Sequence, residues 1–242
     1  GSLGYHGAAV LAARGALRAR PGLVTVYTME DVYVPVAAQL QAAMVHPWKA
    51  GRALPANCST VLFGPGLAAA DLPYNLKTEL SQLWRNAPMP VIADASALDW
   101  LHDGPIRPDS VRLITPHLGE AARMLKRTTA EVQANRVEAL RELSRNWARC
   151  WVVLKGHQSL VGGHAGEGFV NPSGNPHLAQ GGSGDVLAGY LSGLLAQPEL
   201  QADSLQAIRY GVWQHGAVAD ALSVTRANWT IAELLEALGG AR

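Results

Sequence analysis

The segment AQGGSGDVLAG, residues 179–189, places a carboxylate directly after a cluster of glycines, at the start of a predicted helix. Backbone N–H groups at a helix start lack partners and carry the positive end of the helix dipole, so they can bind phosphate. Because glycines let the backbone approach closely, Gly182, Ser183 and Gly184 are the candidate anion-binding residues. Asp185 could take a proton from a hydroxyl that attacks a phosphoryl group, or it could only cap the helix or complement its dipole.

Two more segments carry polar groups where predicted strands end. LITPHLGEAARML, residues 113–125, passes from a strand into a helix and offers His117, either as a ligand contact or as a helix cap. VLKGHQS, residues 153–159, offers Lys155 and Ser159 to a nucleotide, and the alternative is a solvated lysine at a turn. The residue types alone leave each pair of interpretations open.

Other common motifs do not match. A P-loop needs Lys followed by Ser or Thr after its last glycine, and the chain has no such sequence. A nucleophile elbow starting at Gly181 would have Asp185 in place of its final glycine. GPGLAA, residues 64–69, lacks the last glycine of a dinucleotide fingerprint. The eight histidines show neither HExxH nor paired ligand spacing, so no metal ligands are predicted.

The elements that must position these residues follow from hydrophobic patterning. Apolar runs rich in Val, Ile and Leu predict parallel strands covered on both faces, at 23–28, 60–64, 90–94, 111–115 and 150–156. Helical patterns occupy 7–20, 73–86, 117–126, 129–147, 184–196, 203–223 and 230–238. A hairpin is predicted over 159–170, turning near Gly162.

This alternation predicts one α/β domain over residues 1–242, doubly wound, with a mostly parallel central sheet and helices on both faces. Ligand sites in such sheets lie beyond the carboxyl ends of the strands, so the glycine-rich and polar segments are expected to share one edge.

Composition narrows the class of protein. Of the 242 residues, 48% are hydrophobic and 16% charged, enough for a large buried core. The net charge of +1, without a basic stripe, gives nucleic-acid binding little support. No apolar run is long enough to span a bilayer, and no signal peptide is expected. Cys58 and Cys150 predict two free thiols in a reducing cytoplasm. Small molecules are the expected partners.

Taken in order, eight segments resemble the ADP/ATP-dependent NAD(P)H-hydrate dehydratases of the ribokinase-like superfamily. The segments are GSLGYHGAAVLAARGALR, GLVTVYT, VLFGPGLA, VIADASAL, LITPHLGEAARML, VVLKGHQS, GNPHLAQGGSGDVLAGYLSGLLAQ and GVWQHGAVADAL. The TPHxGE segment together with GNPxLAxGGSGDVLAG separates this family from vitamin-precursor kinases of the same fold.

The resemblance implies a repair lyase. Such enzymes use ADP or ATP to remove water from (6S)-NAD(P)H hydrate, by phosphorylating the ring hydroxyl and then losing phosphate. It implies a catalytic role for Asp185, and Mg²⁺ held mainly by the nucleotide's phosphates and water. The implied contacts for the hydrated dinucleotide are Ala8, Gly66, His117 and Asp185. The implied contacts for the adenine nucleotide are Lys155, Gly156, His157, Gln158, Ser159 and Gly184.

The resemblance further implies a cytoplasmic homo-oligomer, by analogy a tetramer, with an NAD(P)H-hydrate epimerase as a fused or separate partner. The chain departs from the family at Ser96, where a second acid is usual beside Asp94, at Ala68, where glycine is usual, and at His6. The family's strand before Gly1 has no counterpart here, so a strand position beside the site is expected to be empty.

Two alternatives remain at this point. One is a small-molecule alcohol kinase of the same superfamily, acting for instance on a thiazole or hydroxymethylpyrimidine alcohol. The other is a nucleotide-binding module without activity, through the change at Ser96 or the absent strand. The TPHxGE segment, which those kinases usually lack, favours the dehydratase.

Overall fold

A computed structural model describes residues 1–52, 55, 57–104, 106–107, 110–166 and 168–240. Its central sheet has six strands in the order β3-β4-β5-β6-β7-β8, and β1 and β2 form a separate parallel pair. The strands are β1 (Thr25–Thr28), β2 (Met44–Pro47), β3 (Val61–Phe63), β4 (Val91–Ala93), β5 (Arg112–Ile114), β6 (Trp151–Leu154), β7 (Leu160–Gly162) and β8 (Phe169–Val170). β3 to β6 are parallel, whereas β7 and β8 are antiparallel to their neighbours.

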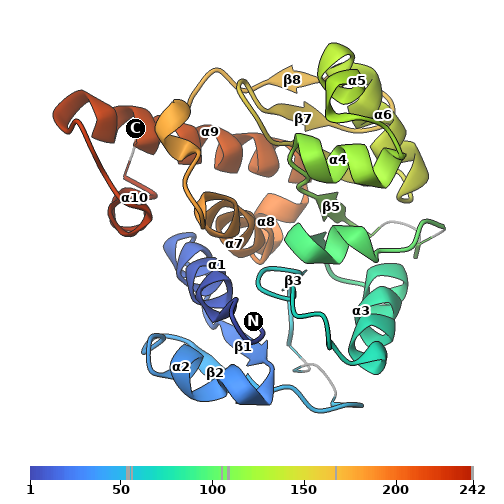
Figure 1. The fold of residues 1–242 in the computed structure, drawn as a ribbon, viewed down its shortest axis with the longest axis vertical. Coiled ribbons are helices and arrows are strands. Elements are labelled where there is room, and N and C mark those ends of the chain that lie inside the picture. Colours follow the sequence, from blue (N-terminus) through green and yellow to red (C-terminus); the bar gives the residue numbers. More distant parts are fainter. Residues whose placement is uncertain (53–54, 56, 105, 108–109, 167, 241–242) are drawn as a thin grey trace.

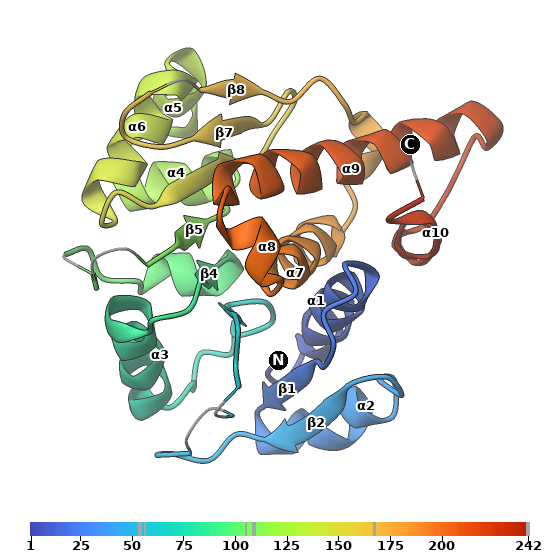
Figure 2. The same cartoon turned by 180° about the vertical axis from the view of Figure 1, so that it is seen from behind.

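Helices cover both faces of this sheet. In Figure 1, α4 and α6 lie in front of the sheet, and Figure 2 shows α9 in front of the opposite face. The helices are α1 (His6–Arg18), η1 (Glu30–Val32), α2 (Tyr33–Ala37), α3 (Tyr74–Asn86), η2 (Ala95–Asp99), α4 (Leu118–Leu125), α5 (Thr129–Ala134), α6 (Arg136–Asn146), η3 (Pro176–Leu178), α7 (Ser183–Leu195), α8 (Pro198–Gln201), α9 (Ser204–Thr225) and α10 (Ile231–Ala237).

Successive side chains on a strand pack alternately into two hydrophobic cores, one on each face of the sheet. On β4, Val91 and Ala93 pack with the α3, α4 and α6 layer, whereas Ile92 between them packs with α7 and α9. This is the period of two expected of a strand buried on both faces. The predicted α/β class, with a mostly parallel sheet between two helical layers, is therefore confirmed.

α1 and α7 pack so closely that only glycine fits where their backbones meet. A Cβ added at Gly189 would lie 1.9 Å from the carbonyl oxygen of Ala12, and one at Gly15 would lie 2.4 Å from that of Val186. One at Gly193 would lie 2.4 Å from the oxygen of Ala16. Glycine costs helix stability but removes the side chain that would separate two backbones. α7, which carries the glycine-rich segment at its start, is thereby fixed to α1.

The five predicted strands form with shorter ends, but one helix prediction was wrong and several elements were not predicted. The helix predicted over 129–147 is two helices, α5 and α6, because Asn135 between them leaves helical geometry with φ −141° and ψ 59°. The elements α2, β2 and α8 were not predicted. The hairpin over 159–170 forms as β7 and β8, and residue 167 lies outside the described residues.

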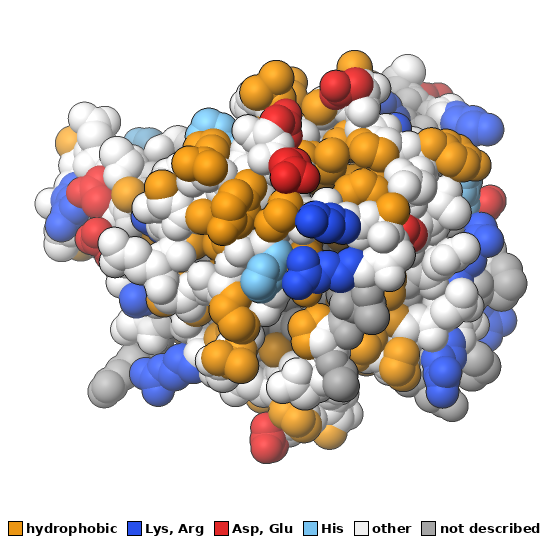
Figure 3. Space-filling model, turned by 90° about the horizontal axis from the view of Figure 1, so that it is seen from below, with side chains coloured by type: hydrophobic (Ala, Val, Ile, Leu, Met, Phe, Trp, Pro, Cys, Tyr) orange, Lys and Arg blue, Asp and Glu red, His pale blue; other side chains and the backbone are white. Residues whose placement is uncertain are grey.

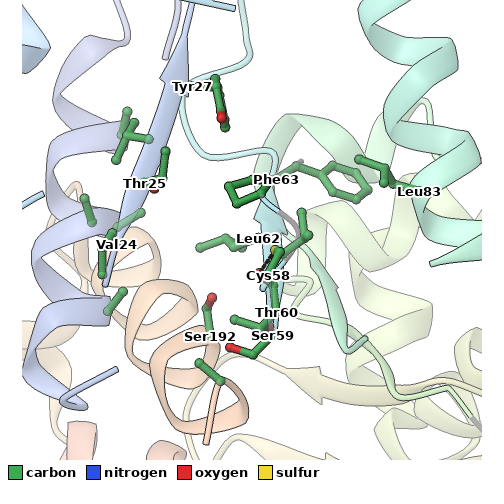
Figure 4. A pocket seen from close by; sticks show the side chains of 18 of the residues that line it. Val24, Thr25, Tyr27, Cys58, Ser59, Thr60, Leu62, Phe63, Leu83 and Ser192 are labelled. Atoms are coloured by element: carbon green, nitrogen blue, oxygen red, sulfur yellow. Dashed lines mark hydrogen bonds between the residues drawn. The ribbon is translucent and has the colours of Figure 1, made fainter. Parts of the chain in front are cut away.

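A cavity of about 1380 Å³ separates β1 from β3. It runs from the start of both strands, near Val24 and Thr60, to their ends, near Thr28 and Gly64. In Figure 4, Val24 and Thr25 lie on one side of it, Thr60 and Leu62 on the other, and Ser192 of α7 beside them. Within the described residues, β1 pairs only with β2 and β3 only with β4, so the edges that face the cavity have no strand partner.

None of the helices in the described part of the chain is long and apolar enough to cross a membrane. The face seen from below in Figure 3 has hydrophobic side chains interrupted by basic and acidic ones. Neither cysteine is in a disulfide, as predicted; Cys150 is buried and Cys58 partly exposed.

Candidate active site

The glycine-rich segment opens helix α7, as the sequence predicts. Gly182 is the residue before the helix and has a left-handed conformation, with φ +94°. A side chain at this position would also collide with Leu11, whose Cδ1 lies 2.3 Å from an added Cβ. Glycine is therefore required here for both its conformation and its size. Of the N–H groups in the first turn, that of Ser183 donates to the Gln180 carbonyl at 3.2 Å, and that of Gly184 has no backbone partner among the described residues.

Asp185 lies in this first turn and is partly exposed. The structure gives α7 no side-chain cap, so the interpretation of Asp185 as a hydrogen-bonding cap is wrong. Burial and then the nearby Asp94 carboxylate raise the pKa of Asp185 to about 6, against the opposing effect of Lys155. A carboxylate with a pKa near neutrality is suited to accept a proton during a reaction at physiological pH.

Lys155 joins the end of β6 to the end of β4. Its Nζ lies 2.8 Å from Oδ1 of Asp94, and the Thr115 hydroxyl donates to the same oxygen at 2.6 Å. The Asp94 side chain is 1% exposed and that of Lys155 17%. Burial acts to lower the pKa of Lys155, but Asp94 and Glu120 outweigh it and leave that pKa above its ordinary value. Lys155 is therefore a buried cation, not the solvated turn residue of the alternative interpretation.

The same ammonium group lies beside the turn formed by Gly182, Ser183 and Gly184. A Cβ added at Gly184 would be 3.3 Å from Nζ of Lys155. The predicted nucleotide contacts Lys155 and Gly184, and the predicted base Asp185 on the next residue, are thus brought together from segments about 30 residues apart in sequence. A phosphate at the helix start would meet backbone N–H groups and a lysine at once.

His117 is the N-cap of α4. Its Nδ1 accepts from the backbone of Gly119 at 2.9 Å and Glu120 at 3.3 Å, while the Glu120 carboxylate accepts from the His117 backbone N–H. The cap interpretation is confirmed, and the contact with substrate stays a prediction. The side chain is 55% exposed, and the backbone of His117 pairs with that of Lys155. The Glu120 carboxylate lies near both side chains, 3.5 Å from Nε2 of His117 and 3.9 Å from Nζ of Lys155.

Ala8 and Gly66, both predicted to contact the dinucleotide, lie against each other. A Cβ on Gly66 would be 3.3 Å from Cβ of Ala8 and 2.4 Å from the carbonyl oxygen of Tyr5. Gly66 has φ +70° and is buried, so glycine is needed for this close approach. Gly1 adjoins this pair, because its Cα would be 3.1 Å from the added Cβ on Gly66.

The remaining predicted nucleotide contacts form an exposed turn after β6. Gly156 has φ +156° and Gln158 φ +53°, and the Ser159 hydroxyl donates to the Gly156 carbonyl at 3.1 Å. Arg136 of α6 holds the turn by donating to the carbonyl groups of His157 and Gln158, each at 2.9 Å. Arg136 was missed, because nothing in the local sequence of α6 indicates which distant carbonyl groups it meets.

His215 of α9 is a second residue that the sequence patterns did not single out. It is 5% exposed, and among the described residues its Nε2 has no hydrogen-bond partner. Burial lowers the pKa of His215 to about 4, although a hydrogen bond with the Ser183 backbone opposes this. A neutral imidazole therefore packs against the start of α7.

No group of three or more His, Cys, Asp or Glu side chains in the described residues is arranged to hold a metal ion. The described site instead combines a helix N-terminus, one buried cation and a half-buried carboxylate. That combination is suited to phosphoryl transfer, which depends on positioning and charge stabilisation.

Comparison with known proteins decides the family. The model of the NAD(P)H-hydrate dehydratase family matches residues 1–238. The chain belongs to the NAD(P)H-hydrate dehydratase family. An ADP-dependent (S)-NAD(P)H-hydrate dehydratase from Neisseria meningitidis is 34% identical over 240 residues, covering 92% of this chain and 75% of that protein.

A bifunctional NAD(P)H-hydrate repair enzyme from Coxiella burnetii is 34% identical over 223 residues, which are 91% of this chain and 44% of the relative. The chain thus spans about half the length of such bifunctional dehydratase relatives.

Solved structures of the dehydratase family have the same fold. The Bacillus subtilis ADP/ATP-dependent NAD(P)H-hydrate dehydratase, co-crystallised with ATP/Mg²⁺ and soaked with CoA, superposes with a TM-score of 0.87 at 30% identity. The match covers 100% of this chain and 88% of that one. A ribokinase from Cryptococcus neoformans in complex with ADP superposes with a TM-score of 0.57 at 15% identity over 95% of this chain and 86% of that one, which shows the fold alone.

Proposed function

We propose that the chain dehydrates (6S)-NAD(P)H hydrate to NAD(P)H at the expense of ADP or ATP. The observation that carries the proposal is the position of Asp185 in the first turn of α7, next to Gly184 and the ammonium group of Lys155. Membership of the dehydratase family and the names of the relatives supply the substrate class.

The arrangement assigns each group a step. Asp185 takes the proton of the ring hydroxyl as the hydroxyl oxygen attacks the terminal phosphoryl group, and the bond from that phosphorus to the leaving AMP or ADP breaks. The N–H group of Gly184, with the ammonium group of Lys155, stabilises the negative charge of the migrating phosphoryl. The new phosphate ester then breaks at its carbon–oxygen bond, the ring loses a proton from the adjacent carbon, and NAD(P)H and phosphate are released.

The charges beside the turn fit a nucleotide that brings Mg²⁺ with it. One cation, Lys155, faces three carboxylates, Asp94, Glu120 and Asp185. Phosphate oxygens and water are ligands that Mg²⁺ prefers, and we propose that they hold it, with these acids nearby and not as a dedicated protein cage. Bound Mg²⁺ would neutralise the charge on the phosphates. Lys155 and the turn would orient the phosphoryl group, and Ala8 and Gly66 would contact the dinucleotide, with the exposed turn at 156–159 facing the adenine nucleotide.

The test incubates the chain with hydrated NADH or NADPH, Mg²⁺, and ADP or ATP, and follows recovery of absorbance by the reduced nicotinamide. We expect recovery with release of phosphate. The variant Asp185→Asn should bind nucleotide nearly as well but lose about 10²–10⁴-fold in kcat, as expected for a general base. Near-normal turnover in this variant would remove Asp185 from that role.

The same experiment separates the alternatives. Phosphorylation of a thiazole or pyrimidine alcohol without recovery of NADH would indicate a kinase of the same fold. Nucleotide binding without either reaction would indicate an inactive module. Either result would contradict the proposed dehydratase activity.

We further propose that the domain contains one more strand, between β1 and β3, contributed by chain that precedes Gly1. The carbonyl of Gly1 accepts from the Thr28 hydroxyl at 3.0 Å, and the Ser2 hydroxyl donates to the carbonyl of Gly66 at 2.7 Å. Gly1 and Ser2 thus connect the carboxyl ends of both strands, where a parallel strand filling the cavity would end.

A version extended upstream by its own reading frame tests this strand. We expect a higher urea midpoint and a larger m-value than for residues 1–242, because more surface becomes buried on folding. Equal midpoints and m-values would contradict the proposal.

We also propose that the chain forms a homo-oligomer, that it is located in the cytoplasm, and that it acts with a fused or separate epimerase. Sedimentation analysis would test the first of these.

A further inference from the structure

The loop that joins β8 to α7, residues 171–182, lies along one side of α9. The α9 positions that meet it are spaced three, four and three apart, and so share one face of the helix. They are Trp213, Gly216, Asp220 and Ser223. The Ser173 hydroxyl donates to the Trp213 carbonyl at 2.7 Å, and a Cβ at Gly216 would be 2.4 Å from the Ser173 hydroxyl oxygen.

Both oxygens of the Asp220 carboxylate are used to hold this loop. Oδ2 accepts from the backbone N–H of Gly174 at 2.7 Å, and Oδ1 accepts from the side-chain amide of Asn175 at 2.9 Å. No basic side chain of the described residues forms an ion pair with Asp220. Hydrogen bonds to a charged acceptor are about twice as strong as neutral ones, so these two dominate the contact between loop and helix.

From Asn175 a series of hydrogen bonds continues to the start of α7. Oδ1 of Asn175 accepts from the backbone of His177 at 3.1 Å and begins η3. The side chain of Gln180 donates to the His177 carbonyl at 2.8 Å, and the Gln180 carbonyl accepts from the backbone of Ser183 at 3.2 Å. Each link fixes the next residue, so the position of the anion-binding turn depends on where Asn175 is held.

We propose that Asp220 is a positioning residue that sets the place of the Gly182–Gly184 turn, and with it Asp185, relative to the phosphoryl group. This inference rests on the proposed function. Asp220 touches neither reactant; it acts through Gly174 and Asn175. Because a misplacement of about 1 Å can cost on the order of 10²-fold in rate, a carboxylate remote from the chemistry can still control kcat.

Exchanging the two partners gives a specific test. Asp220→Asn places an amide against the amide of Asn175, and Asn175→Asp places a carboxylate against that of Asp220. The double variant Asp220→Asn with Asn175→Asp restores one donor facing one acceptor, with their roles reversed. In it, the amide oxygen at position 220 could still accept from Gly174, and the carboxylate at position 175 could still accept from His177.

We expect each single variant to lower kcat about ten- to a hundredfold while KM for ADP stays within about threefold, because the turn acts on the migrating phosphoryl. The double variant should recover kcat to within about threefold of the original chain. The control is Asp203→Asn at the other end of the same helix, where Asn can replace Asp as an N-cap, and it should change neither constant. Unchanged kcat in both single variants, even with a lower melting temperature, would overturn the proposal.

Hydrogen exchange of the backbone amides of Gly174 and Ser183 separates failure of this inference from failure of the proposed function. We expect both amides to exchange at least about tenfold faster in Asp220→Asn and to recover in the double variant. This measurement needs no turnover, so it still tests the contact if the original chain proves inactive as a dehydratase. If the Ser183 amide exchanges at the original rate in Asp220→Asn, the series of hydrogen bonds does not position the turn, and the inference is wrong.

Discussion

The carboxyl ends of the strands and the gap between β1 and β3 both adjoin α1 and α7, but they are built in opposite ways. At the strand ends, Asp94, Thr115 and Lys155 use one another as partners at 2.6–2.8 Å. In the gap, two strand edges face a cavity of about 1380 Å³ without a strand partner among the described residues. The strand ends depend on specific side-chain partners, whereas the gap between β1 and β3 contains unfilled space. Substitutions in the two regions should therefore differ in cost.

The largest loss of stability should follow removal of the buried cation. Lys155→Met leaves the Asp94 carboxylate, which is 1% exposed, without its opposite charge. Breaking a buried ion pair from one side costs about 3–5 kcal/mol, to be measured by urea unfolding at pH 7. The control Lys49→Met, at an exposed lysine, should stay within about 0.5 kcal/mol. If the two variants unfold alike, the strand ends do not depend on this pair.

The next largest effect should come from the interface between α1 and α7. Gly189→Ala pushes a methyl group to within 1.9 Å of the Ala12 carbonyl oxygen and should cost about 1–3 kcal/mol. The control Gly7→Ala lies in α1 with no atom within 4 Å of the new methyl and should stabilise the chain by about 0.5–1 kcal/mol. Thermal unfolding measures both, and equal melting temperatures for the two variants would disprove the close packing.

A third effect depends on pH. The pKa of Asp185 is raised to about 6, above its value of about 3.9 in an unfolded chain. Its contribution to stability is therefore complete at low pH and is lost as the pH rises through 6. Asp185→Asn should melt at a higher temperature than the original chain at pH 8, with the difference vanishing near pH 4. A constant difference across that range would show that Asp185 has an ordinary pKa.

The smallest effect should be seen in the gap. Ala196→Leu adds apolar volume to a residue that lines the cavity at the end of α7, where space exists. We expect a change within about 0.5 kcal/mol in residues 1–242 by urea unfolding. In the upstream-extended version the same change should cost about 1–3 kcal/mol, since the added strand would occupy that space. Equal costs in both would mean that nothing enters the gap.

What the sequence could predict was local. The apolar runs indicated five strands in the correct order, and the glycines before Asp185 indicated the helix start, because periodicity and glycine conformation are encoded over a few neighbouring residues. β2 was not predicted because its four residues, Met44–Pro47, are at least partly exposed and contain no run rich in Val and Ile. The break between α5 and α6 at Asn135 was not predicted, because the helical spacing of apolar residues continues through it.

The partners within the site were not predictable in this way. Lys155 and Asp94 are 61 residues apart and meet because β5 places β4 and β6 in a particular register. Arg136 and Asp220 likewise bind backbone groups whose position depends on the packing of whole helices. Individual candidates such as His117 could be identified from their residue type, but the groups they contact are a property of the assembled sheet.

The contact of Gly189 with the Ala12 backbone also determines which parts of the molecule are free to move. With no side chain between them, α1 and α7 can neither slide nor rotate past each other without a backbone collision. Ala8 on α1 and Asp185 on α7 are therefore held at a fixed spacing. A ligand that touched both Ala8 and Asp185 would meet two groups whose spacing is set by the helix contact and not by the ligand.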